Sequence, residues 1–142
     1  MKNKSKVISE LQLVKKAHKR LLRSAEIDVC LDVPIMGRCV DLAYLCKGEI
    51  TTIEFKLKDW KRALKQARDH MLGADYCYIC MPERSITDYF KTEIESSGIG
   101  LLFFRNEEGW PFQIIVEAPR SRQVWEVVHN KTKEYIQMKK GA

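Results

Sequence analysis

The chain lacks the long apolar runs that mark targeting and membrane-spanning segments. No window holds about eighteen uncharged apolar residues, and the lysine-containing N-terminus has no apolar stretch of the kind found in signal peptides. Internal repeats, low-complexity tracts and linkers rich in Pro, Gly or Ser are also absent. We therefore expect a cytoplasmic protein that does not cross a membrane, folded as a single domain over residues 1–142.

Cysteine is present, but not in a pattern that supports disulfides or zinc. The five cysteines are an odd number in mostly apolar, strand-like stretches, which favours reduced and buried thiols. Cys77 and Cys80 form a CxxC, but no second CxxC or CxxH accompanies it. Strand alternation also directs the two sulfurs to opposite faces of a sheet. The sequence therefore predicts core cysteines rather than a metal or redox site.

The formal net charge of +6 is unevenly distributed along the chain. Segments 1–23, 56–70 and 119–142 are basic, whereas the segments between them are acidic. Such segregation indicates a polyanionic partner, and nucleic acid fits better than a membrane because the basic helices lack a broad apolar face for lipid. A lysine-rich surface that is merely solvated is the alternative.

Hydrophobic periodicity predicts an α/β fold with a mixed central sheet flanked by helices. Lys47, Gly48 and Glu49 are typical of a hairpin turn, and Asp59 is placed to cap the helix that follows it. The later strands are joined through helices, so we expect them to be parallel neighbours. The expected helices are 5–23, one beginning near 60, 86–96 and 124–138, and the expected strands are 27–33, 39–46, 50–57, 76–81, 99–104 and 112–116.

Two acidic residues occur in stretches that otherwise look buried. Asp41 lies in the apolar strand 39–46 and Glu54 in the strand 50–57, where burial of a carboxylate is costly without a partner. If the tight turn sets the strand register, the two side chains lie on the same face of the sheet. Lys56 shares that face, because it is two residues beyond Glu54.

Two carboxylates that converge repel each other unless a cation lies between them. Asp41, Glu54 and the backbone carbonyl of Phe55 offer an all-oxygen ligand set suited to Mg²⁺, with Mn²⁺ as a substitute. A metal-bound water is a nucleophile near neutral pH. Lys56 is suited to orient or deprotonate that water and to stabilise developing negative charge. An ordinary ion pair between Glu54 and Lys56 is the alternative interpretation.

The order of these residues resembles the PD-(D/E)XK nuclease superfamily. The segments VPIMGRCVDLAYL, ITTIEFK, WKRALKQARDH and GIGLLFF follow one another as in its small DNA-repair and Holliday-junction-resolving members. The resemblance covers about residues 5–104 and implies a restriction-endonuclease-like αβββαβ core, to which 112–138 adds a strand and a helix. Asp41 then corresponds to the motif aspartate, although Val40 stands where a proline often precedes it.

The same resemblance assigns roles to other residues. Glu54 and Lys56 correspond to the ExK pair, and Glu10 to a first-helix glutamate near the metal. Gln66 matches a glutamine that touches the site or DNA in several branches, although an ordinary polar position also explains it. A bond to a neighbouring side chain is the alternative for Glu10. On a helical wheel Glu10 falls within the apolar arc of the first helix, which consists of Val7, Leu11, Val14, Leu21 and Leu22.

The resemblance also implies a DNA partner. Arg38 either contacts the scissile strand or caps its turn. We expect a Mg²⁺-dependent DNA endonuclease, directed by DNA structure or with little sequence preference, in repair, recombination or mobile-element biology. A homodimer is expected because cutting two strands needs two sites. RNA is less favoured because no aromatic stacking motif is visible, and a non-catalytic nucleic-acid-binding module is the alternative. The side chains placed to hold phosphates are Lys15, Lys16, Lys19, Arg20, Lys58, Lys61, Arg62 and Lys65.

Overall fold

The computed structural model describes residues 8–140 and consists of four helices and six strands in that range. The elements are α1 (Glu10–Leu21), β1 (Asp28–Ile35), β2 (Arg38–Cys46), β3 (Glu49–Phe55), α2 (Trp60–Asp69), β4 (Tyr76–Pro82), α3 (Asp88–Ser97), β5 (Gly100–Phe104), β6 (Phe112–Val116) and α4 (Glu126–Lys139). Every predicted helix and strand is present, with bounds shifted by a few residues. The mixed α/β fold with an αβββαβ core is confirmed.

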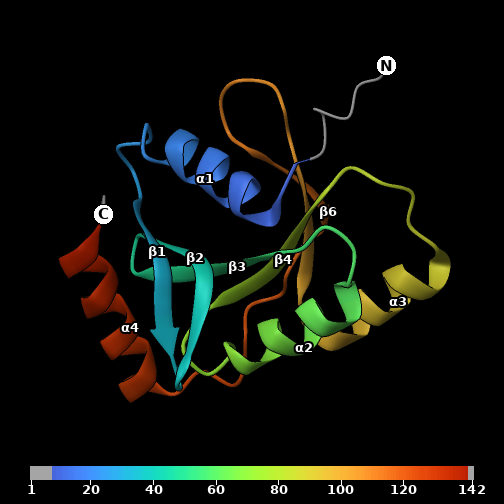
Figure 1. Cartoon of the computed structure of the whole chain (residues 1–142). Coiled ribbons are helices and arrows are strands. Elements are labelled where there is room, and N and C mark those ends of the chain that lie inside the picture. The colour runs from blue at the N-terminus through green and yellow to red at the C-terminus, as the bar shows by residue number, and fades with distance from the viewer. Residues whose placement is uncertain (1–7, 141–142) are drawn as a thin grey trace.

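The six strands form one mixed sheet in the order β1-β2-β3-β4-β5-β6. β3, β4 and β5 are parallel, because α2 and α3 return the chain to the same edge after each strand, and the other neighbouring strands are antiparallel. Figure 1 shows α1 over one face of the sheet and α2, α3 and α4 over the other. The sheet is thus covered on both faces, which explains its apolar central strands.

Each face of the sheet has its own hydrophobic core. Leu13 and Ala17 of α1 pack against Ile53 and Phe55 of β3 on one face. Residues of the other three helices pack on the opposite face, among them Ala63, Ile94 and Ile136. The two cysteines of the CxxC belong to different cores, Cys77 to the second and Cys80 to the first, and all five thiols are free. The prediction that they face opposite ways is therefore confirmed.

The first helix begins later than predicted. Its N-cap is Ser9, whose side chain accepts a hydrogen bond from the Gln12 backbone while the Gln12 side chain accepts one from the Ser9 backbone. This capping box sets the start of the helix, so that Glu10 is its first residue. The predicted start over residues 5–7 lies outside the described residues.

The buried face of α1 is also displaced from the predicted arc. Leu11 and Leu22 were expected in the core but are 61% and 45% exposed. Val7 lies outside the described residues. Glu10 lies on the same side of α1 as the buried stripe, because it precedes Leu13 by three residues and Val14 by four. That stripe consists of Leu13, Val14, Ala17 and Leu21.

Two tight hairpins set the register of the first three strands. Lys47 and Gly48 form the turn between β2 and β3 with φ of 52° and 82°, a combination typical of a type I′ hairpin. The predicted end of the first strand at residue 33 is wrong, because β1 continues through Pro34 to Ile35. Proline is tolerated there since β1 is an edge strand of the sheet and needs no N–H donor on its outer side.

The two edges of the sheet differ in what lies beside them. α4 packs against β1 and β2 at one edge, and β6 forms the other edge beside β5. Figure 1 shows α4 next to β1, far from β6. Between residues 8 and 140, no helix combines the length and apolar character that a membrane span requires.

Candidate metal and nucleic-acid site

Asp41 and Glu54 meet on adjacent strands. The register of β2 and β3 pairs Leu42 with Ile53, so Asp41 and Glu54 occupy the next opposed position, on one face of the sheet. Each carboxyl group perturbs the pKa of the other, which places the two side chains close together, and Asp41 Oδ2 accepts the backbone N–H of Phe55 at 2.8 Å. Because the turn between the strands has only two residues, this approach is built into the hairpin.

The carboxyl pair is strongly perturbed. Burial, followed by the charge of Asp41, raises the pKa of Glu54 to about 8, and the charge of Lys56 only partly opposes this. Burial also raises the pKa of Asp41, although the Phe55 N–H and the charge of Lys56 act in the other direction. Without a cation, the pair therefore retains a proton at neutral pH, mainly on Glu54.

Glu10 reaches the same end of β3 from α1. Its Oε2 accepts the backbone N–H of Leu57 at 3.1 Å, two residues beyond the last residue of the strand. Its charge contributes to the raised pKa of Asp41, which places the two carboxyl groups near each other. One alternative for Glu10, a bond to His18 or to a lysine, is not found among the hydrogen bonds and ion pairs of residues 8–140. Glu10 instead joins α1 to the segment that carries Lys56.

The residues present fit Mg²⁺ in part. Within residues 8–140, no three His, Cys, Asp or Glu side chains converge closely enough to hold a metal ion among themselves. Mg²⁺ in proteins commonly takes one or two carboxylates and keeps several waters, so Asp41 and Glu54 satisfy that pattern without a third side chain. The forced approach of the buried Glu54 and the half-buried Asp41 carboxyl groups also suits a cation. The Phe55 carbonyl and Glu10 as direct ligands stay predictions.

Lys56 lies beside the pair at the end of β3. Its backbone N–H donates to the Cys80 carbonyl at 3.0 Å, which continues the hydrogen bonding with β4 by one residue. Its charge acts on both Asp41 and Glu54 in the direction that favours the carboxylate form. Lys56 is in none of the ion pairs formed within residues 8–140, so it is not committed to the simple ion pair with Glu54.

His70 is a member of the site that the sequence analysis missed. It follows the last residue of α2, is 1% exposed, and its Nδ1 lies 3.4 Å from Glu54 Oε2. Neither ring nitrogen has a hydrogen-bond partner among the described residues. Burial lowers the pKa of His70 to about 4, so the ring is neutral at physiological pH. The available signal was its spacing of three and seven residues from the buried Ala67 and Ala63.

The predicted nucleic-acid residues surround this end of the sheet from two sides. Lys15 and Lys19 are exposed on α1, and Figure 1 shows α1 and α2 on opposite faces of the sheet. Arg38 forms a partly exposed ion pair with Asp69, in which its Nε lies 3.5 Å from Asp69 Oδ2. Gln66 is partly buried on α2, and its predicted contact stays a prediction. The predicted basic residues on α2 and just before it are all exposed: Lys58, Lys61, Arg62 and Lys65.

Arg20 has a structural role that the sequence did not predict. Its guanidinium group donates to backbone carbonyls of the loop between β5 and β6, at Arg105, Glu107, Gly109 (3.0 Å) and Trp110 (3.3 Å). Arg20 thereby fastens this loop to α1, and its phosphate contact stays a prediction. The bonded carbonyls lie more than eighty residues further along the chain, so no local pattern indicated these bonds.

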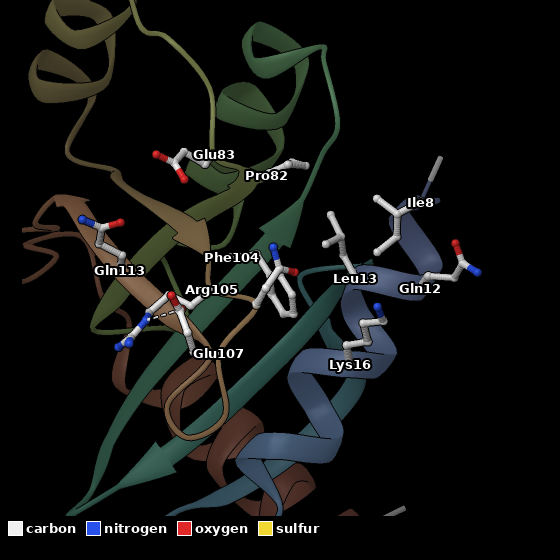
Figure 2. A pocket seen from close by; sticks show the side chains of 11 residues that line it. Ile8, Gln12, Leu13, Lys16, Pro82, Glu83, Phe104, Arg105, Glu107 and Gln113 are labelled. Atoms are coloured by element: carbon white, nitrogen blue, oxygen red, sulfur yellow. Dashed lines mark hydrogen bonds and ion pairs between the residues drawn. The ribbon is translucent and has the colours of Figure 1, made fainter. Parts of the chain in front are cut away.

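A cleft of about 990 Å³ lies next to this region. Figure 2 shows side chains of α1 on one side of it and the ion pair of Arg105 and Glu107 on the other. Leu13 and Phe104 supply apolar surface, while Lys16 supplies a positive charge. The cleft includes Pro82 and Phe104, the last residues of β4 and β5, so it opens at the carboxyl edge of the parallel strands, where β3 also ends. Clefts of this size and place hold ligands in many α/β proteins.

The fold and the site together define a mixed α/β protein with a buried acidic pair and a lysine at the end of a central parallel strand. No family model matches the chain, and no curated protein matches it. Two solved structures are similar in fold. At the identities found, the similarity shows the fold and does not extend to function.

The first of these structures is a protein of unknown function from Silicibacter pomeroyi. It is 20% identical, with a TM-score of 0.64 over 92% of this chain and 86% of that chain. The second is an XisH family protein from Nostoc punctiforme. It is 19% identical, with a TM-score of 0.53 over 75% of this chain and 98% of that chain.

Proposed function

We propose that this chain is a Mg²⁺-dependent DNA endonuclease of the PD-(D/E)XK type. The observation that carries the proposal is the buried contact of Asp41 with Glu54 at the end of β3, with Lys56 beside it. Buried acids with raised pKa values that meet a cationic group are typical of catalytic sites. The segment order that resembles the superfamily and the αβββαβ core support the same assignment.

The residues of the chain have separate tasks in this proposal. Asp41 and Glu54 would hold a Mg²⁺ ion, which would supply an activated water and withdraw charge from the phosphoryl group. Lys56 stabilises the negative charge that develops on the phosphate oxygens and is placed to orient the attacking water. The neutral ring of His70 lies against Glu54 and limits the positions that this carboxylate adopts. Glu10 fastens the segment after β3 through its bond to the Leu57 N–H.

The proposed substrate is DNA. Exposed basic residues on α1 and α2 contact phosphates from the two faces of the sheet and position the strand without reading its sequence. A homodimer would supply a second site for the second strand. Within residues 8–140, all helices and strands belong to the sheet and the layers that cover it, so the proposal includes recognition of DNA structure or weak sequence preference.

The direct test is cleavage of labelled duplex, flapped, branched and single-stranded DNA with Mg²⁺ or Mn²⁺. We expect Asp41→Asn and Lys56→Ala to reduce the cleavage rate by roughly 10²–10³-fold or more. Lys131→Ala is the matched control, because Lys131 is an exposed lysine on α4 at the other end of the sheet. The proposal is wrong if no DNA is cut, or if Lys56→Ala cuts as fast as the unaltered protein.

A non-catalytic nucleic-acid-binding module is the second candidate. The observation that favours it is that, within residues 8–140, no three His, Cys, Asp or Glu side chains are grouped so that they could hold a metal ion. Calorimetric titration with Mn²⁺ separates the two candidates. Binding that disappears in Asp41→Asn supports the metal site, whereas DNA binding without any Mn²⁺ binding or cleavage supports the module.

A further inference from the structure

Three aromatic rings form a row where α2 and α3 begin. The rings of Trp60 and Phe90 are stacked, with centroids 4.3 Å apart and an interplanar angle of 18°. The ring of Tyr89 meets Trp60 edge-on, with centroids 5.8 Å apart. Phe90 is 1% exposed, Trp60 is half-buried and Tyr89 is 55% exposed. The row therefore leads from the core to the surface and ends in a ring that is more than half exposed.

Two cationic side chains accompany these rings. Lys61 Nζ lies 5.8 Å from the Trp60 ring centroid and 5.2 Å from that of Tyr89. Arg84 lies over the Phe90 ring, with its Cζ 5.3 Å from the centroid. Neither Lys61 nor Arg84 is in an ion pair with another residue of the segment 8–140. Their positive charges remain available to an anionic ligand.

The row lies at the same edge of the sheet as the carboxyl pair. A helix that follows a parallel strand begins at the carboxyl edge of the sheet, and ligands of open α/β sheets bind outside that edge. Trp60 is the first residue of α2, four positions beyond Lys56, and Tyr89 is the second residue of α3. In Figure 1, both helices begin on the side toward which β3 and β4 run.

An exposed ring beside a free ammonium group has the chemistry of a single-strand binding surface. Bases stack on aromatic side chains, and nearby cations meet the phosphates. In a duplex both faces of each base are covered by neighbouring bases, so an exposed ring favours an unpaired base. Packing of α2 on α3 does not need the exposed Tyr89 ring, because Trp60 on Phe90 already supplies that contact.

We infer that Trp60, Lys61 and Tyr89 bind an unpaired nucleotide of single-stranded DNA beside the carboxyl pair. This inference rests on the proposed function and deepens it, because it assigns the enzyme to DNA with an unpaired segment, such as a single strand, a flap or a branch. Tyr89 supplies the stacking face, Trp60 supports that ring from behind, and Lys61 contacts the adjacent phosphate.

The test is binding, measured separately from cleavage. Fluorescence anisotropy is recorded with single-stranded and blunt duplex DNA of equal length, without divalent cations, in an Asp41→Asn background. We expect Tyr89→Ala to weaken single-strand binding by roughly 5- to 100-fold and to leave duplex binding within about twofold. Tyr89→Phe retains the affinity, because it keeps the ring. Lys61→Ala reduces the slope of log K against log salt for the single strand by about 0.7.

The control variant is Trp125→Ala, which removes another exposed aromatic residue, 57% exposed, at the N-cap of α4. It leaves both affinities unchanged, and melting temperatures confirm that each variant folds. The inference is overturned if Tyr89→Ala changes neither affinity, if it weakens both equally, or if the Asp41→Asn parent does not bind single strands. Ring-dependent binding with no cleavage in the earlier assay overturns the nuclease proposal and leaves the binding surface intact.

Discussion

Two buried carboxyl groups, one in β3 and one just before the neighbouring β4, differ in the hydrogen-bond donors that surround them. Glu54 near the end of β3 and Asp75 just before β4 are both 5% exposed. Asp75 accepts the Ile50 backbone N–H at 2.8 Å, lies 2.8 Å from His129 Nε2 and is 3.4 Å from the Arg120 guanidinium. Glu54 faces another carboxyl group and a neutral histidine instead. Burial alone therefore does not distinguish the two acids, whereas the number of compensating donors does.

Asp75 has a structural task. Its contacts join the beginning of β3, the segment before α4 and α4 itself, because Ile50, Arg120 and His129 come from these three places. Arg120 also pairs with Glu49, and the Asp75 carbonyl accepts the Ser121 N–H at 2.7 Å. A carboxylate with this many donors is satisfied where it is and has no need of a cation.

The largest expected effect comes from removing the satisfied acid. Asp75→Ala leaves the Ile50 N–H, Arg120 and His129 without their shared acceptor, so we expect a loss of about 3–5 kcal/mol in the free energy of unfolding. Urea denaturation measures it. Asp69→Ala is the matched control, because Asp69 is largely exposed and pairs only with Arg38, and its loss should stay below about 1 kcal/mol. Equal losses in the two variants would remove the distinction drawn between Asp75 and a surface acid.

Replacing Glu54 should raise the free energy of unfolding, where replacing Asp75 lowers it, and the size of this effect should depend on pH. Its pKa is about 8 in the folded protein and about 4.5 in the unfolded chain, so between these values the folded state retains a proton that the unfolded state releases. The stability from Glu54 is fully present below about pH 4.5 and is lost as pH rises through 8. Glu54→Gln stays neutral, and at pH 8.5 without metal we expect it to be more stable by about 2 kcal/mol.

Denaturant melts at pH 4.5 and 8.5 measure this difference for Glu54→Gln. Glu95→Gln is the control, because Glu95 is exposed on α3. It should shift stability little at either pH. If Glu54→Gln were less stable than the unaltered protein at pH 8.5, the Glu54 carboxylate would be stabilised by its surroundings, as that of Asp75 is. The distinction drawn between the two acids would then be wrong.

A divalent cation should stabilise the folded protein through Glu54 and not through Asp75, by less than the effects of the substitutions above. At ten times its Kd, Mn²⁺ should stabilise the unaltered protein by about 1.4 kcal/mol, since it binds the folded state alone. Asp75→Asn should keep this gain although its starting stability is lower, and Glu54→Gln should lose it. Thermal melts at pH 7.5 with increasing Mn²⁺ test both statements. A gain retained by Glu54→Gln would place the bound cation elsewhere.

The smallest expected effect concerns the two histidines beside these acids. His70 has no hydrogen-bond partner among the described residues, so His70→Leu should change the free energy of unfolding by less than about 1 kcal/mol. His129→Leu should lower it further, because Asp75 loses a donor at 2.8 Å. Chemical denaturation of both variants at pH 7.5 makes the comparison. A larger loss for His70→Leu would show that the ring supports Glu54 in the resting protein.

The part of the site that sequence reasoning reached is local. Asp41 and Glu54 were predicted to share a face because alternation along each strand and the short turn at Lys47 and Gly48 determine the register. Lys56 followed from its spacing of two residues. The elements themselves were predictable for the same reason, because apolar periodicity and turn residues act over a few positions.

The rest depends on segments that are distant in the sequence. His70 reaches Glu54 only because α2 packs over β3, and Arg20 binds a loop more than eighty residues away. Tyr89 joins Trp60 because α2 and α3 both begin at the carboxyl edge of the sheet. No local pattern specifies these contacts, since each follows from the angle and position of a helix on the sheet.

The sequence by itself determined the order of helices and strands and the pairing of Asp41 with Glu54, because period-two alternation and a two-residue turn leave one register that buries the apolar side chains. Tertiary structure alone decided which acid is compensated. Asp75 obtains its donors from α4 and the segment before it, whereas Glu54 is covered by α2 and the His70 ring, whose nitrogens make no hydrogen bond within residues 8–140. The physical reason is that a buried charge is stabilised only by the groups that packing brings to it.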